Sequence, residues 1–98
     1  MGLYFEWDDD KARLNRVNHV IAFEEAQTVF IDPVARIFDD EVHSVDEERE
    51  IIIGHSARDR LLLVCFAQRD DIIRIISARK ATKKERTDYE QSAFGQIS

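Results

Sequence analysis

Two arginines and a serine around one apolar strand are the residues of this sequence best suited to chemistry on a phosphate. Arg74, Ser77 and Arg79 lie within or just after the run Ile72–Ala78. Guanidinium groups hold phosphates through paired, charge-assisted hydrogen bonds. Strict alternation puts Ser77 and Arg79 on one face and Arg74 on the other, so both arginines reach one phosphate only if the strand twists or bulges. The alternatives are a snorkelling structural role for Arg74 and a surface ion pair for Arg79.

The segment that follows is basic although the chain is acidic. Between Arg74 and Arg86 there are six Lys or Arg residues and one acid, whereas the 98 residues carry a formal net charge of −6. A local basic patch on an acidic chain indicates an anionic partner, and nucleic acid is the first candidate. Two explanations are possible for the cations of this segment: they contact an RNA backbone, or they form an ordinary solvated helix end. These cations are Lys80, Lys83, Lys84 and Arg86.

Three more residues are candidates for proton transfer or phosphate binding. His19 is a candidate because an unperturbed histidine, with a pKa of about 6.5, can shuttle protons near neutrality, although a histidine at a helix C-terminus also simply favours the helix dipole. Glu48 and Arg49 belong to the segment Asp39–Glu50, whose seven acids have solubility as their alternative role. A proton acceptor, a donor and guanidinium groups suffice to cleave RNA through its own 2′-hydroxyl.

Other kinds of site find no support in the sequence. There is no CxxC, HExxH or glycine-rich phosphate loop, so we expect neither a metal nor a cofactor. Cys65 lies in an apolar run and is expected to be a buried free thiol in a reducing compartment. The N-terminus becomes acidic before any apolar run reaches signal-peptide length, and no stretch approaches membrane-spanning length. These features predict a cytoplasmic protein without membrane contact.

Two helices and a short strand are expected before the main sheet. Residues 4–7 form the strand, and a first helix follows the acids at 8–10 and runs to about Asn18. Its Leu14 and Val17 are expected to face inward. The helical period then continues in a second helix from Phe23 to Phe30, which ends before Asp32-Pro33.

The remaining elements are strands and one final helix. Four segments rich in β-branched and aliphatic residues predict the strands 34–38, 50–54, 61–68 and 72–78. Because their links are short, we expect an antiparallel sheet of about four strands, with the apolar run 61–67 in its centre. The residues expected to be buried are Leu62, Val64, Phe66, Ile73, Ile75 and Phe30.

The final helix begins with the capping-box spacing Thr82-Lys83-Lys84-Glu85. It is polar nearly all round, and its apolar anchors are Tyr89 and Ala93. Such a helix favours a partner chain, with docking on its own domain as the alternative role of Tyr89. Residues 1–98 are therefore expected to form a single α+β domain.

The order and spacing of these motifs resemble the BrnT toxins of type II toxin-antitoxin systems. The residues that carry the resemblance span positions 5 to about 90 and are Phe5-Glu6-Trp7-Asp8, Lys11, Asn15, His19, Phe23-Glu24-Glu25-Ala26, Phe30-Ile31-Asp32-Pro33, Asp46-Glu47-Glu48-Arg49, Arg74-Ile75-Ile76-Ser77-Ala78-Arg79-Lys80-Ala81, Glu85-Arg86 and Tyr89-Glu90. The resemblance implies a RelE-like fold, a metal-independent endoribonuclease that arrests translation, and a BrnA-like ribbon-helix-helix antitoxin that binds operator DNA. Where the family usually has Lys-His-Gly, this chain has Asn18-His19-Val20. A cation is thus missing beside the histidine, and the turn is expected to be reshaped because valine disfavours positive φ.

Two functions follow as hypotheses. In the first, the protein is a ribonuclease toxin in which Arg79 and Arg74 stabilise the phosphate while His19 or Glu48 handles protons. In the second, it is a non-catalytic module that binds its antitoxin, through Tyr89 and Ala93 among others, and tunes repression of the operon. Because the chain is acidic, the antitoxin would make the DNA contacts.

Overall fold

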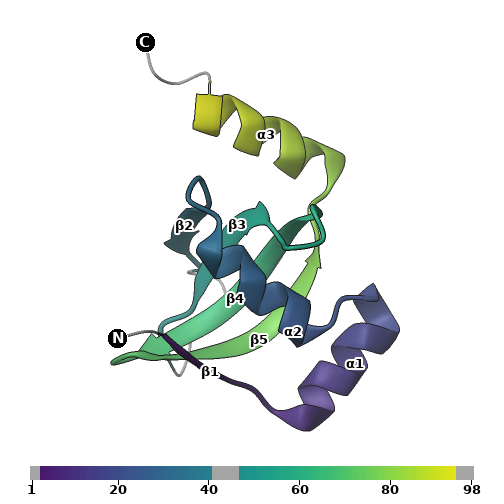
Figure 1. The fold of residues 1–98 in the computed structure, drawn as a ribbon, viewed down its shortest axis with the longest axis vertical. Coiled ribbons are helices and arrows are strands. Elements are labelled where there is room, and N and C mark those ends of the chain that lie inside the picture. The colour runs from purple at the N-terminus through teal and green to yellow at the C-terminus, as the bar shows by residue number, and fades with distance from the viewer. Residues whose placement is uncertain (1–2, 41–46, 95–98) are drawn as a thin grey trace.

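Five strands form one mixed sheet in the computed structural model, which describes residues 3–40 and 47–94 (Figure 1). The strand order is β1-β5-β4-β3-β2. The bounds are Tyr4–Glu6 for β1, Arg36–Asp39 for β2, Glu50–His55 for β3, Leu61–Arg69 for β4 and Ile72–Lys80 for β5. The strands from β2 to β5 pair antiparallel, as predicted, and β4 is the central strand.

The first strand extends the sheet beyond the four strands that we expected. β1 pairs with β5 through Phe5 and Ile73, and this pair is parallel. The prediction of a purely antiparallel sheet of four strands is therefore wrong at this edge. A parallel pair needs a long crossover, and the chain between β1 and β5 supplies one because it contains all the helices of the first half and three strands.

The helices divide between one face and one end of the sheet. Their bounds are Asp9–His19 for α1, Phe23–Ala26 for α2, Gln27–Ile31 for the 3-10 helix η1 and Lys83–Phe94 for α3. Figure 1 shows α1 and α2 over one face of the sheet and α3 at the opposite end of the molecule from α1. The second predicted helix is thus an α-helix of only four residues that tightens into η1. The tightening accompanies a side-chain bond, in which the Thr28 hydroxyl donates to the carbonyl oxygen of Glu25.

The buried side of α1 is not the one that its apolar residues predicted. Leu14 is 50% exposed and Val17 is 71% exposed, whereas Asn15 is buried. The Asn15 amide binds the backbone of Ala78 on both sides, donating to its carbonyl and accepting from its N–H at 2.8 and 3.0 Å. The helix therefore docks on β5 through a polar side chain, because that side chain satisfies strand groups that no neighbouring strand pairs.

The main core lies between the sheet and the helices of its covered face. The five strand residues predicted to be buried are all at most 2% exposed, and Phe30 is partly buried against them. Phe30 contacts the rings of Phe5 and Phe66 edge to face, with ring centres 5.3 and 5.0 Å apart. The aromatic contacts tie η1 to both β1 and β4.

The last helix docks on its own domain through Tyr89, which is the alternative role that the sequence left open for this residue. Tyr89 is 4% exposed and packs with Ile53 and Leu61, and its hydroxyl donates to the carbonyl oxygen of Val34 at 3.3 Å. The predicted capping box at the start of α3 is confirmed by reciprocal bonds between Thr82 and Glu85. None of the helices that the structure describes is long and apolar enough to cross a membrane.

Candidate active site on the open face of the sheet

A bulge in β5 brings the three phosphate-site candidates onto one face. Opposite β4, the pairing passes from Ser77 directly to Ile75, which leaves Ile76 without a partner. As a result Arg74, Ser77 and Arg79 all point away from the core residues Ile73, Ile75 and Ala78. The condition that the sequence set for both arginines to share a face is therefore met.

We call this side of the sheet the site face, and two cross-strand rows define it. The first row consists of Arg36, Ile53, Leu63 and Arg79, and the second of Phe38, Ile51, Cys65 and Ser77. Helices α1, α2 and η1 pack on the opposite face. Among the described elements, only α3 reaches the site face, and it covers one end through Tyr89.

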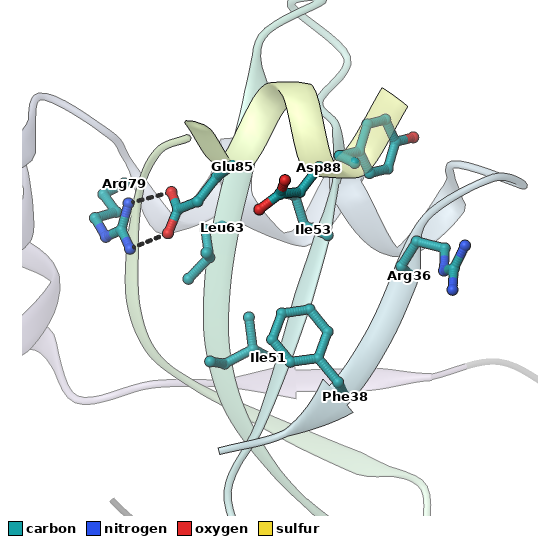
Figure 2. Close-up of a pocket in the computed structure, with 9 residues that line it drawn as sticks. Arg36, Phe38, Ile51, Ile53, Leu63, Arg79, Glu85 and Asp88 are labelled. Carbon is teal, nitrogen blue, oxygen red and sulfur yellow. Dashed lines mark hydrogen bonds and ion pairs between the residues drawn. The ribbon is translucent and has the colours of Figure 1, made fainter. Parts of the chain in front are cut away.

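Arg79 is held by a carboxylate from α3. Its two terminal nitrogens donate to the two oxygens of Glu85 at 2.8 and 2.9 Å, a bidentate pair seen at the left of Figure 2. The Arg79 hydrogen bonds lower the pKa of Glu85 from 4.5 to about 2, against the opposing effect of burial. The fork that would bind a phosphate is thus occupied by a competing anion of the same chain.

Arg74 lies at the other end of the site face, beside a hollow of ≈ 310 Å³. Its guanidinium is within 3.7 Å of Glu6 and 3.9 Å of Glu47. Exposed Glu48 lines the same hollow, and half-buried Arg49 accepts a backbone bond from Asp40. Five residues along the strand separate Arg74 from Arg79. At a rise of about 3.3 Å per residue, this distance is too large for the two side chains to lie next to each other on one phosphate. The two arginines frame a longer stretch of the face.

His19 does not join this group. It is exposed at the C-terminal end of α1, in the layer that covers the opposite face of the sheet. Within residues 3–40 and 47–94, no hydrogen bond or ion pair connects it to Arg74, Arg79 or Glu48. The turn beside it is not reshaped as expected, because Val20 adopts the left-handed conformation at φ 60° and ψ 28° and closes a bond to the carbonyl of Arg16.

The predicted backbone-binding cations surround the α3 end of the site face. Lys80 is exposed at the end of β5, and Lys83, Lys84 and Arg86 are exposed in the first turns of α3. Lys84 is paired with Asp88 one turn later at 3.0 Å. Of the two antitoxin-binding candidates, Tyr89 is already buried in its own domain, and Ala93 lies on the last turn of α3, where only the backbone is described.

A groove that the sequence did not indicate lies between α3 and β2. It has a volume of ≈ 300 Å³ and an apolar floor of Ile51, Ile53 and Leu63, with Phe38 rising beside it (Figure 2). Charged groups border the groove at Arg36, Arg79, Glu85 and Asp88. The sequence could have indicated this groove through the spacing of Arg36 and Phe38, because two residues that lie two positions apart in a strand point to the same face.

The cysteine is confirmed as a buried free thiol. Cys65 is 8% exposed, and its Sγ donates to a carboxylate oxygen of Asp40 at 3.6 Å. Burial, and then the neighbouring carboxylate, raise the pKa of Cys65 to about 11, so it is an inert thiol at neutral pH. No group of three or more potential metal ligands occurs among the described residues.

Comparisons with known proteins agree with this fold. The family model for "Ribonuclease toxin, BrnT, of type II toxin-antitoxin system" matches residues 7–85. No curated protein matches the sequence significantly. Among solved structures, the fold is similar to the 1.1 Å crystal structure of the Brucella abortus ribonuclease toxin BrnT. That match has a TM-score of 0.64 at 20% identity and covers 83% of this chain and 99% of the other, so it is a likeness of fold.

Proposed function

This chain belongs to the BrnT family of ribonuclease toxins of type II toxin-antitoxin systems, and we propose that it arrests translation by cutting RNA without a metal. The observation that carries the proposal is the bulge at Ile76, which turns Arg74, Ser77 and Arg79 toward the same face of the sheet, opposite α1, α2 and η1. We take residues 1–98 as one such domain, acting in the cytoplasm where the RNA is.

The reaction would use the substrate's own nucleophile. The 2′-hydroxyl of RNA attacks the adjacent phosphorus and the bond to the 5′-oxygen breaks, which leaves a cyclic phosphate and a new 5′-hydroxyl. Arg79 would hold the charge that develops on the phosphate, with the Ser77 hydroxyl two residues away on the same face. Arg74 would bind the strand further along.

A carboxylate is the better-placed proton acceptor. Glu48 lines the hollow beside Arg74, whereas His19 belongs to the layer on the other side of the sheet. We therefore place Glu48 ahead of His19 as the group that accepts the 2′-hydroxyl proton, which requires the scissile phosphate to lie between Arg74 and Arg79 on the site face. Arg49, next to Glu48 in the chain, is a candidate for orienting it. The exposed cations Lys80, Lys83, Lys84 and Arg86 would bind flanking phosphates without reading the sequence.

The partner would be a BrnA-like ribbon-helix-helix antitoxin. We propose that it covers α3 and the adjacent end of the site face, so that RNA cannot reach Arg79. Buried Tyr89 then supports the antitoxin-binding helix from below, and Ala93 lies on the same helix. The antitoxin would contact operator DNA, because a chain with net charge −6 is repelled by DNA.

The test of the enzyme is cleavage of RNA in the presence of a chelator by wild type, Arg79→Ala and Arg74→Ala. Loss of Arg79 should cost about 2 to 4 kcal/mol of transition-state stabilisation, comparable with removal of one oxyanion-hole donor. The matched control is Arg13→Ala, a surface arginine of α1 paired with Asp10. Full cleavage by a folded Arg79→Ala variant would remove Arg79 from the mechanism. His19→Ala should be milder.

The antitoxin has a separate test. Co-expression with a ribbon-helix-helix antitoxin of the BrnA type should give a complex that co-purifies and does not cut RNA. Full cleavage by the purified complex would contradict inhibition by coverage of the site face.

One observation favours a second function. Because Glu85 fills the Arg79 fork, the protein could be a non-catalytic module that binds its antitoxin and tunes repression. The two functions differ in one readout. A catalytic site should become more active when Glu85 is neutralised, and a binding module should cut no RNA in either form.

A further inference from the structure

The groove beside β2 contains an aromatic ring that is half exposed. Phe38 is 48% exposed on the site face of an edge strand, opposite Ile51 of β3. Figure 2 shows its ring next to Ile51, at the side of the apolar floor. At ≈ 300 Å³ the groove lies at the small end of the range for small-molecule sites, which suits one flat ring system rather than a long segment.

The charges around the groove distinguish a base from other occupants. Arg79 belongs to the row next to Phe38, and three strand spacings of about 4.8 Å separate β2 from β5. A ring on Phe38 would thus lie on the same face as a phosphate on Arg79. The carboxylates of Glu85 and Asp88 border the groove as acceptors for ring or exocyclic N–H groups. Both carboxylates are paired within the chain, Glu85 with Arg79 and Asp88 with Lys84, so a base would share them with these cations.

We propose that this groove binds one unstacked nucleobase of the RNA, with Phe38 as its stacking platform and Arg79 at the neighbouring phosphate. The inference rests on the proposed ribonuclease function and adds to it a subsite that positions the strand. Single-stranded RNA is commonly held by aromatic rings in this way, because every base has a π-face.

The experiment is an affinity measurement on short single-stranded RNAs, methylated on the 2′-oxygens so that they cannot be cut. An abasic ribose is moved along the strand, and binding is followed by fluorescence anisotropy. With wild type, one abasic position should weaken binding by roughly five- to 150-fold, the value of one stacked base. Phe38→Ala should show the same loss with intact RNA and no further loss at that position, and Phe38→Trp should bind like wild type.

Two controls separate this proposal from the proposed function. Ile37→Ala changes the neighbouring residue of β2, which is 55% exposed on the opposite face, and should leave binding unchanged. Arg79→Ala should weaken intact and abasic RNAs equally, so the phosphate site is tested independently of the base.

Each remaining outcome is decisive. The base subsite would be overturned if Phe38→Ala bound RNA with wild-type affinity, or if its loss of affinity added in full to the loss from an abasic ribose at every position. The dependence of RNA binding on Arg79 would persist in either case. A Phe38→Ala variant that loses the antitoxin but not RNA would assign the groove to a protein partner instead. Absence of RNA binding by the wild-type protein would overturn both proposals.

Discussion

Glu85 accepts two hydrogen bonds from the guanidinium of Arg79 while it also accepts one from the backbone N–H of Thr82. One carboxylate therefore closes the start of α3 and occupies the strand arginine at the same time. Any phosphate that binds Arg79 must displace Glu85 or share the guanidinium with it. The docking of α3 and the availability of the site are thus linked through a single side chain.

Neutralising this carboxylate should make Arg79 more available. Glu85→Gln keeps an oxygen for the capping box, which glutamine also serves, but removes the charge that competes with phosphate. Because the pair is partly exposed, we expect RNA affinity to rise only roughly two- to fivefold. Glu90→Gln removes an exposed acid of the same helix and controls for net charge. Equal gains in the two variants would show that Glu85 does not compete specifically.

The same pair predicts a loss of stability in acid. The pKa of Glu85 is about 2 in the folded protein and 4.5 as its ordinary value, so the folded state binds its proton less readily than the unfolded state. Its contribution is complete above about pH 4.5 and is lost as the pH falls toward 2. Glu25, whose pKa is lowered by Arg60, contributes in the same direction. Melting temperatures measured across this range should fall less steeply for Glu85→Gln than for wild type.

The strands were more predictable than the side-chain directions of the site. The apolar run identifies β4 because a central strand is covered along most of its length, and the β-branched residues identify β5. The bulge at Ile76 is a tertiary feature, and alternation alone placed Arg74 on the wrong face. The core pattern of Ile73, Ile75 and Ala78 reveals the shift only once their burial is known.

In the helices, the sequence predicted local contacts but not the contacts made with other elements. Capping-box spacing predicted that Glu85 turns back to Thr82, but its second bond depends on how β5 delivers Arg79 to the start of α3. In α1, an apolar pattern favoured Leu14 and Val17 over the polar residue that is buried. A buried amide is stable only where it finds hydrogen-bond partners, and the sequence does not show which backbone groups will lie opposite it.

The amide of α1 gives a direct stability prediction. Asn15→Ala would leave the buried N–H and carbonyl of Ala78 without their partner and would also free the carbonyl of Ile21, to which Asn15 donates at 2.9 Å. We expect a loss of about 2 to 4 kcal/mol in the free energy of unfolding. Asn18→Ala, an exposed asparagine of the same helix, should stay within about 0.5 kcal/mol of wild type. Similar urea midpoints for the two variants would contradict a structural role of the amide.

The end of α1 should gain stability from a glycine. Val20 holds a left-handed conformation that costs a side-chain-bearing residue roughly 1 to 2 kcal/mol, and it is 73% exposed, so little packing is lost when its side chain is removed. After the greater flexibility of glycine in the unfolded chain is subtracted, Val20→Gly should raise the free energy of unfolding by about 0.5 to 1 kcal/mol. The matched control is Val17→Gly, which changes an equally exposed valine of the same helix.

The two glycine variants should move in opposite directions. Val17 lies inside the helix, where glycine is unfavourable, so Val17→Gly should lower the free energy of unfolding. Urea denaturation of both variants beside wild type measures the difference, with the slope of the transition showing that the unfolded state is unchanged. Destabilisation of both proteins to the same extent would mean that the conformation of Val20 carries no strain.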